Sequence, residues 1–309
     1  MNEILKYFPT KILEKIKDNL INNFSNMEEI RIRVDKPIIL KFSNDEKILN
    51  CSPSQEEILL IMQNICENSI YSYQNQICKG YITINGGHRI GITGNVVFDN
   101  NKVINISYIS SLNFRIAKQI KGAADNLLKY VLDVENNTIY NTIIISPPGG
   151  GKTTILRDLI RQISTGIEYI NYKPITVGVV DERGEIAAMH KGKCQNDIGI
   201  KTDVIDNIPK AIGMEMLIRS MAPQVICADE IGNEKDVEAI NYAFCSGIKG
   251  IFTMHGNNMC DLEKNRNINK LIEEKIIERL IFLNPYNKGK IKCVYALNEE
   301  KNSYILKTL

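Results

Sequence analysis

The chain has 309 residues, and its formal net charge at pH 7 is +2. This length exceeds what one compact core usually fills, so we expect two domains. Hydrophobic residues make up 44% and charged residues 24% of the chain, which is ordinary for a soluble globular protein. The nearly balanced charge excludes neither nucleic acid nor a membrane surface as a partner, but it gives no electrostatic argument for either.

The eight cysteines form no C-x-x-C pair, and none has a histidine at the spacing of a metal site. Most of them lie in apolar runs, which predicts reduced, buried thiols in a cytoplasmic protein. Charges interrupt the apolar positions of the first residues, so we expect no signal peptide. No run of about 18 apolar residues occurs, so we expect no membrane span.

Residues 1–120 predict a small N-terminal α+β domain, which opens with a helix and two strands. Apolar residues recur at helical spacing over 9–24 and predict an amphipathic helix. Alternation over 29–34 predicts a strand, and a second short strand follows Pro37.

The same domain continues with a capped helix and a hairpin. Ser54 and Glu57 form a capping-box pattern ahead of an apolar run, so a helix is expected to begin there. Two strand-like runs over 81–98 surround Gly86 and Gly87, which predicts a β-hairpin.

A second domain is predicted over residues 141–309, after a linker or helix at 121–140. The run "TIIIS" (142–146) is continuously apolar, as in a parallel strand buried on both faces. Strand-like and helical runs then alternate, which predicts a mostly parallel sheet with helices on its faces. The expected strands are 175–181, 225–230 and 250–255, the helices are 208–221 and 234–246, and a terminal group of strands covers 279–284, 290–297 and 303–309.

The stretch "SPPGGGKTT" lies between the first of these strands and a helical pattern. Glycines before a helix N-terminus let backbone N–H groups approach an anion closely. We therefore predict that Lys152 reaches the β- and γ-phosphates of a nucleotide and that Thr153 offers its hydroxyl to Mg²⁺. The pattern matches G-x-x-x-x-G-K-[ST] except at Ser146, and the alternative is a glycine-rich loop with a solvated lysine. The predicted nucleotide-binding residues are Ser146, Pro147, Pro148, Gly149, Gly150, Gly151, Lys152, Thr153 and Thr154.

The strand "QVICADEIG" ends in two carboxylates. The carboxyl end of a neighbouring parallel strand faces the same crevice as the glycine-rich loop. Asp229 is predicted to hold Mg²⁺ through water, and Glu230 to orient or deprotonate the attacking water. The alternative is a strand followed by a solvated acidic turn.

A third group, "VVDERGEIA", follows another buried strand. Asp181, Glu182 and Glu185 could supply a metal-side carboxylate, with Glu182 as the catalytic candidate and Arg183 turned to a phosphate or a neighbouring subunit. The alternative is that Arg183 and Glu185 are surface charges.

The last motif, "TMHG", ends a fourth strand. His255 is predicted to sense the γ-phosphate by hydrogen bonding, and the alternative is a structural histidine. His190 is expected after a short apolar helix at the surface.

These four motifs occur in an order that resembles the type II/type IV secretion ATPase superfamily, with its Walker A motif, Asp box, Walker B motif and His box. Segments such as "GGHRIGITGNVV" and "GMEMLIRSMAPQVICADEIG" are similar to those of one branch, the stage III sporulation AA family. The similarity is clearest over residues 28–256.

The resemblance implies an ATPase with a RecA-like P-loop core, a preceding N-terminal domain, and ATP and Mg²⁺ as cofactors. It implies a homo-oligomeric, hexameric ring on the mother-cell side, peripheral to the forespore-facing membrane. Membrane proteins of the sporulation channel are its expected partners, and hydrolysis is expected to energise assembly or transport.

In such rings, arginines of the N-terminal domain reach the nucleotide of a neighbour. Arg89 and Arg115 stand in the matching segments, with Arg31 and Arg33 as further candidates. One arginine supplied in trans can raise the rate by about 10³-fold or more. The alternative for each is a surface strand residue. Asn233 stands where relatives often carry arginine.

Two other functions remain open at this point. A nucleic-acid translocase on the same core predicts turnover stimulated by DNA, although no stripe of basic residues with interleaved aromatics occurs. A nucleotide-gated scaffold predicts ATP binding without appreciable turnover.

Overall fold

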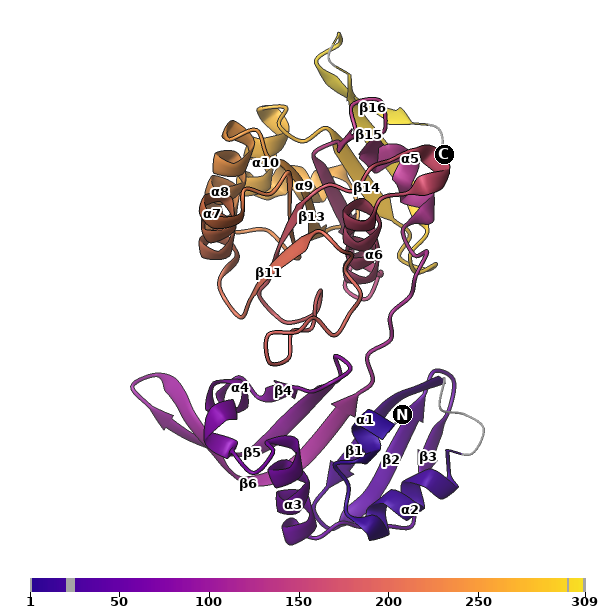
Figure 1. The fold of residues 1–309 in the computed structure, drawn as a ribbon, viewed down its shortest axis with the longest axis vertical. Helices are drawn as coiled ribbons and strands as arrows, with labels where there is room; N and C mark the ends of the chain where they lie inside the picture. Colours follow the sequence, from indigo (N-terminus) through magenta and orange to yellow (C-terminus); the bar gives the residue numbers. More distant parts are fainter. Residues whose placement is uncertain (1, 21–25, 299, 308–309) are drawn as a thin grey trace. The chain divides into compact units, whose positions relative to one another are not determined.

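The computed structural model describes residues 2–20, 26–298 and 300–307, which form two compact units (Figure 1). Unit 1 comprises Met1–Lys118 and Met189–Gln195. Unit 2 comprises Gln119–Ala188 and Asn196–Leu309. Each unit has its own sheet.

Unit 1 is built on a six-stranded antiparallel sheet in the order β3-β2-β1-β6-β5-β4. The strands are β1 (Met27–Arg33), β2 (Lys36–Phe42), β3 (Glu46–Ile48), β4 (Tyr81–Thr83), β5 (Arg89–Asp99) and β6 (Lys102–Arg115). The helices are α1 (Asn2–Leu5), α2 (Thr10–Asp18), α3 (Gln55–Ile65) and α4 (Gln74–Cys78), with the 3₁₀ turn η2 (Ile70–Tyr73).

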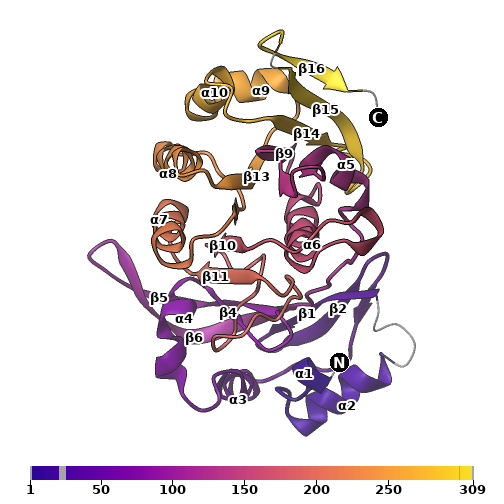
Figure 2. The same ribbon diagram turned by 45° about the horizontal axis from the view of Figure 1, so that its top comes forward.

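Helices cover one face of this sheet (Figure 2), and polar side chains of β1 project from the other. Ile30 and Ile32 of β1 are fully buried in one core with Ile16 of α2 and Ile61 of α3. Because successive strand residues point to opposite faces, Arg31 and its odd-numbered neighbours project from the other face. The polar face therefore remains outside the core of unit 1.

The short segment 189–195 is part of unit 1 although it lies far along the chain. The Nδ1 atom of His190 is 3.2 Å from the carbonyl oxygen of Thr83. The backbone N–H of Gly86 donates to Oε1 of Gln195 at 2.8 Å. These bonds add the segment to the end of the sheet that carries β4.

Unit 2 is built on an eight-stranded sheet in the order β11-β10-β12-β13-β9-β14-β15-β16. Neighbours are parallel from β11 to β14, and β14, β15 and β16 are antiparallel. The strands are β9 (Thr142–Ser146), β10 (Val177–Asp181), β11 (Thr202–Asp206), β12 (Val225–Ala228), β13 (Lys249–His255), β14 (Arg279–Leu283), β15 (Ile291–Asn298) and β16 (Ser303–Lys307).

Helices lie on both faces of the larger sheet (Figure 2). Helix α6 packs on one face, and α7 and α8 pack on the other, where Ile143 and Ile145 share a core with Met214 and Ile240. The helices are α5 (Leu128–Val131), α6 (Lys152–Thr165), α7 (Lys210–Met221), α8 (Glu234–Cys245), α9 (Met259–Lys264) and α10 (Arg266–Glu273), with 3₁₀ turns η3 (Asp125–Leu127) and η4 (Glu168–Ile170) and a small hairpin of β7 (Leu132–Asp133) and β8 (Thr138–Ile139).

Most predicted elements are confirmed, and a few are not. The capping box at Ser54 begins α3, and the hairpin over 81–98 pairs β4 with β5. The helix expected over 9–24 ends at Asp18, and residues 21–25 lie outside the described residues. The helix expected before His190 is wrong, because this part of the chain has turns and bends there.

Candidate functional site

The glycine-rich loop joins β9 to the N-terminus of α6. Gly151 has a φ of 94°, which favours glycine because L side chains are strained there. A Cβ atom on Gly150 would clash with the side chain of Ser146. Ser146 thus fills the space beside Gly150 and makes glycine necessary at position 150.

Lys152 is the first residue of α6, and its side chain folds back over the loop. Its Nζ atom donates to the carbonyl oxygens of Ser146 at 2.9 Å and Pro147 at 3.1 Å. It also lies 3.1 Å from Nδ1 of His255. Burial lowers the pKa of Lys152, although the charges of Asp229 and Glu230 act in the opposite direction.

The next residue, Thr153, meets the carboxylate at the end of β12. Its hydroxyl donates to Oδ2 of Asp229 at 2.5 Å, and the hydroxyl of Thr253 donates to Oδ1. A hydroxyl and a carboxylate are hard oxygen donors of the kind that Mg²⁺ takes alongside water and phosphate. The described residues contain no group of three His, Cys, Asp or Glu side chains that could hold a metal ion by themselves. The pair therefore fits a Mg²⁺ ion that takes its remaining ligands from water and phosphate.

Glu230 stands beside this pair in a strained backbone conformation. Its φ of 53° is uncommon for a residue with a side chain. Its backbone N–H donates to Oγ1 of Thr253 at 2.9 Å, which fixes the turn. Its carboxylate forms an ion pair with Arg183 and lies 3.0 Å from Nε2 of His255.

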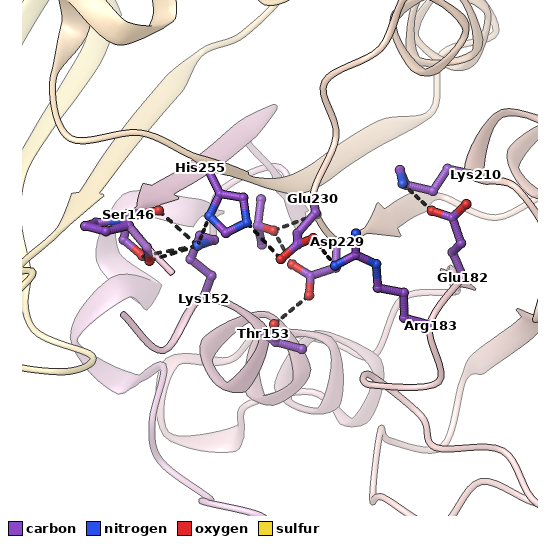
Figure 3. A network of polar contacts seen from close by, with 11 residues as sticks. Ser146, Lys152, Thr153, Glu182, Arg183, Lys210, Asp229, Glu230 and His255 are labelled. Carbon is purple, nitrogen blue, oxygen red and sulfur yellow. Dashed lines mark hydrogen bonds and ion pairs between the residues drawn. The ribbon is translucent and has the colours of Figure 1, made fainter. Parts of the chain in front are cut away.

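His255 links the lysine to the glutamate (Figure 3). An ammonium group has only donors, so Nδ1 of His255 must accept from Lys152. The proton of the neutral ring is then on Nε2, where it is donated to Glu230. Lys152, His255, Glu230 and Arg183 thus form one continuous polar chain.

The acidic loop after β10 is organised by its first residue. The buried carboxylate of Asp181 accepts four backbone N–H bonds, at 2.8 to 3.2 Å, from residues 185–188. Arg157 of α6 donates to the carbonyl oxygens of Glu185 and Ile186, at 2.5 and 2.9 Å. Asp181 therefore holds the loop, and Arg157, which we did not predict, ties it to α6.

Glu182 and Glu185 take different positions in this loop. Glu182 forms an ion pair with Lys210 of α7, on the far side of Arg183 from Lys152 (Figure 3). Glu185 lies on the wall of the main cavity of unit 2, and Glu182 is not among the lining residues.

That cavity has a volume of about 680 Å³ and lies over the glycine-rich loop. Its walls include residues 148–155, Glu185, Glu230 and His255, so the four sequence motifs share one cavity. The lining residues that we did not predict are Ile120, Gly122, Ala123, Asn126, Ile155, Lys288, Gly289 and Lys290. Lys288, Gly289 and Lys290 lie in a loop without periodicity, where a glycine between two lysines was the available signal.

The candidate arginines all lie in unit 1, on the polar face of its sheet. Arg31, Arg33 and Arg115 line a cavity of about 310 Å³, together with Asn113, whose buried Oδ1 atom has no hydrogen-bond partner among the described residues. Arg89 is paired with Arg115 across β5 and β6, and its guanidinium lies 3.5 Å from the ring centroid of Tyr81.

Arg31 and Arg115 both approach the same carboxylate. They lie 2.7 and 3.9 Å from Glu29, respectively. Burial raises the pKa of Glu29, but the hydrogen bond from Arg31 and the charges of Arg31, Lys41 and Arg115 outweigh it, so the pKa is lowered. The face therefore carries more positive than negative charge.

Comparison with known proteins identifies the family. The family model described as "Sporulation stage III, protein AA" matches residues 1–302. This chain belongs to that family. It is 38% identical over 296 residues to Stage III sporulation protein AA of Bacillus subtilis (strain 168), covering 96% of this chain and 95% of the relative.

Two solved structures have a fold similar to that of this chain. The Legionella pneumophila ATPase DotB has a TM-score of 0.59 at 15% identity, covering 95% of this chain and 83% of that chain. The pilus retraction motor PilT with bound ADP has a TM-score of 0.53 at 16% identity, covering 87% of this chain and 76% of that chain. The fold is accordingly the predicted RecA-like α/β core with a smaller α+β part. Within the described residues, every helix is too short or too polar to cross a membrane.

Proposed function

We propose that this member of the sporulation stage III protein AA family is a Mg-ATP-hydrolysing ring ATPase. The observation that carries the proposal is the meeting of Lys152 and Thr153, at the head of α6, with Asp229 and Glu230, which follow β12. In the sheet, β12 is separated from β9 only by β13. Anion-binding backbone, a phosphate-binding lysine and paired carboxylates are the parts that phosphoryl transfer requires.

Binding would use the loop and the helix N-terminus together. Residues 149–154 line the cavity, and the N-terminus of α6 carries the positive end of the helix dipole. Lys152 would exchange its carbonyl partners for phosphate oxygens, and Thr153 with Asp229 would hold Mg²⁺. When bound, Mg²⁺ neutralises charge on the β- and γ-phosphates.

Hydrolysis would depend on Glu230. Its carboxylate could orient or deprotonate the attacking water once Arg183 moves aside. His255 would sense the γ-phosphate by hydrogen bonding, because it contacts both Lys152 and Glu230. Glu182 is paired with Lys210, on the side of Arg183 away from the glycine-rich loop, so any part that it takes in hydrolysis would be indirect and would pass through that ion pair.

The second half of the proposal is assembly. Arg89 and Arg115, with Arg31 and Arg33 beside them, would stabilise the transferring phosphoryl group in the site of a neighbouring protomer. An excess of arginine on one sheet face supports this role, because it is a ready partner for phosphate. The ring would be a hexamer.

The cellular setting follows the relative from Bacillus subtilis, whose name assigns it to stage III of sporulation. We propose that the ring lies in the mother-cell cytoplasm, peripheral to the forespore-facing membrane. There it would bind membrane proteins of the channel and energise its assembly or transport through it.

One observation favours a second candidate, a nucleotide-gated scaffold. Glu230 is held by both Arg183 and His255, and a glutamate that stays so held could not activate water. The scaffold would bind ATP through the same loop and turn it over at a negligible rate.

The test combines ATP turnover and ATP binding in wild type and Glu230→Gln, measured against protein concentration with and without Mg²⁺. Loss of the carboxylate should lower turnover by about 10²- to 10⁴-fold. ATP binding measured by calorimetry should remain. Glu238→Gln, an exposed change on α8, is the matched control.

Three results separate the candidates. Mg²⁺-dependent turnover that rises cooperatively with concentration supports the ring ATPase. Tight ATP binding with no turnover at any concentration supports the scaffold. A wild-type chain that binds no nucleotide refutes both.

A further inference from the structure

The loop between β14 and β15, residues 284–290, is closed by its own hydrogen bonds. The backbone N–H of Asn284 donates to the carbonyl oxygen of Lys290 at 2.7 Å. The side chain of Asn284 accepts from the backbone N–H groups of Tyr286 and Asn287, at 2.9 and 3.0 Å. The loop therefore has a defined shape.

A backbone hydrogen bond joins this loop to the glycine-rich loop. The N–H of Gly289 donates to the carbonyl oxygen of Gly150 at 3.2 Å. A Cβ atom on Gly151 would lie 3.4 Å from the nitrogen of Gly289, so the two loops are in close contact. The contact arises because β14 pairs in parallel with β9, whose carboxyl end begins the glycine-rich loop.

Two lysines flank Gly289 and line the cavity. Lys288 and Lys290 are exposed, and neither ammonium group has a hydrogen-bond or ion-pair partner among the residues described. The two carboxylates of the same cavity are Glu185 and Glu230, and Glu230 is already paired with Arg183. The wall formed by this loop therefore offers positive charge to a ligand.

The strand order places Lys288 and Lys290 on the side of the glycine-rich loop away from Glu230 and His255. Glu230 and His255 follow β12 and β13, which lie on one side of β9, whereas β14 lies on the other side. A polyphosphate whose last phosphate points toward Glu230 would have its first phosphates nearer the β14–β15 loop.

We propose that Lys288 and Lys290 bind the α- and β-phosphates of the nucleotide in cis, which makes the β14–β15 loop a second phosphate-binding arm. The inference rests on the proposed nucleotide site and adds ligands that none of its sequence motifs contains. The ligand class is a nucleoside diphosphate or triphosphate.

The experiment measures the dissociation constants of ATP, ADP and adenosine by calorimetry for Lys288→Ala, Lys290→Ala and the double variant. Hydrogen bonds to charged groups predict about a 10-fold weaker binding of both ATP and ADP for each lysine. Adenosine should bind with unchanged affinity. Lys301→Ala, an exposed lysine in the β15–β16 turn, is the matched control.

Lys290→Arg adds a rescue arm, because it keeps the charge and should keep most of the affinity. Thermal unfolding of each variant confirms that it is folded.

The outcomes distinguish this inference from the proposed function. Wild-type affinity in the double variant, with affinity lost in Lys152→Ala, overturns the inference and leaves the proposed function standing. Equal losses for adenosine and ATP also overturn it, because the loop would then shape the cavity and not bind phosphate. Absence of nucleotide binding in wild type refutes both.

Discussion

Charged side chains are paired differently in the two units. In unit 2, Lys152, His255, Glu230 and Arg183 contact one another in sequence at the carboxyl edge of the sheet, here called the polar edge. On the face of unit 1, two arginines share Glu29 and a third stacks on Tyr81.

The difference follows from burial. Lys152 is 5% exposed, so its charge requires close acceptors, whereas the side chains of Arg31 and Arg115 are 40% and 63% exposed and solvent screens them. The edge is thus arranged before any ligand arrives, and the face is suited to an anion supplied from outside.

Arg115, on the arginine-bearing face of unit 1, is expected to be the most sensitive of these positions to substitution. Arg115→Ala should lower turnover by about 10³-fold if the guanidinium acts in a neighbouring site, while ATP binding to the isolated chain is unchanged. Steady-state turnover and calorimetry measure the two quantities. Lys102→Ala, at the far end of the same strand, is the control.

Mixing two inactive variants tests whether Arg115 acts in the site of a neighbouring protomer. Arg115→Ala chains keep an intact loop, and Lys152→Ala chains keep the arginine, so mixed rings should recover part of the activity. If the mixture stays as inactive as its components, Arg115 does not act in trans.

A smaller effect is expected at the polar edge. Arg183→Gln removes the ion pair with Glu230, and because Arg183 is 60% exposed, the pair contributes only about 0.2 to 1 kcal/mol. Releasing the carboxylate should therefore raise turnover at saturating ATP by about two- to five-fold. A fall in turnover would instead assign Arg183 a direct part in the reaction.

The last prediction concerns the dependence of the stability of unit 1 on the protonation of His88, a buried histidine. Burial lowers the pKa of His88 from 6.5, although Glu3 opposes the shift, and Nδ1 accepts from the N–H of Ala117 at 3.0 Å. The unfolded chain then binds more protons than the folded one below about pH 6.5, so unit 1 loses stability as the pH falls through that value.

Amide hydrogen exchange at Ala117 between pH 7.5 and 5 measures this loss as a falling protection factor. His88→Gln should remove the pH dependence. Equal pH dependence in wild type and variant would show that His88 is not the titrating group.

The sequence predicted the parts of the fold that repeat regularly. A continuous apolar run gives β9, helical spacing gives α6 and α8, and the alternation of strands with helices gives the parallel sheet. Because parallel strands end at one edge, the order of motifs was sufficient to bring Asp229 and His255 near Lys152.

What the sequence did not predict depends on contacts between distant residues. β11 is a half-exposed edge strand with a weak pattern, so it was missed. Lys288 and Lys290 lie more than 130 positions from Lys152 in a turn with no periodicity, and only the pairing of β14 with β9 brings them to the cavity. Asp181 belongs to a cluster that could have supplied a carboxylate to a metal, and nothing in its spacing indicated that its carboxylate accepts four backbone N–H bonds.

The return of residues 189–195 to unit 1 means that neither unit is encoded by one uninterrupted stretch of the gene. A recombinant fragment that stopped at Lys118 would leave the carbonyl of Thr83 and the amide of Gly86 without the side chains that satisfy them. The peptide that supplies those side chains begins directly after the loop that Asp181 and Arg157 hold in shape. An insertion or deletion in that loop would therefore displace His190 and Gln195 from their partners in unit 1, so the length of the loop constrains the evolution of the smaller unit.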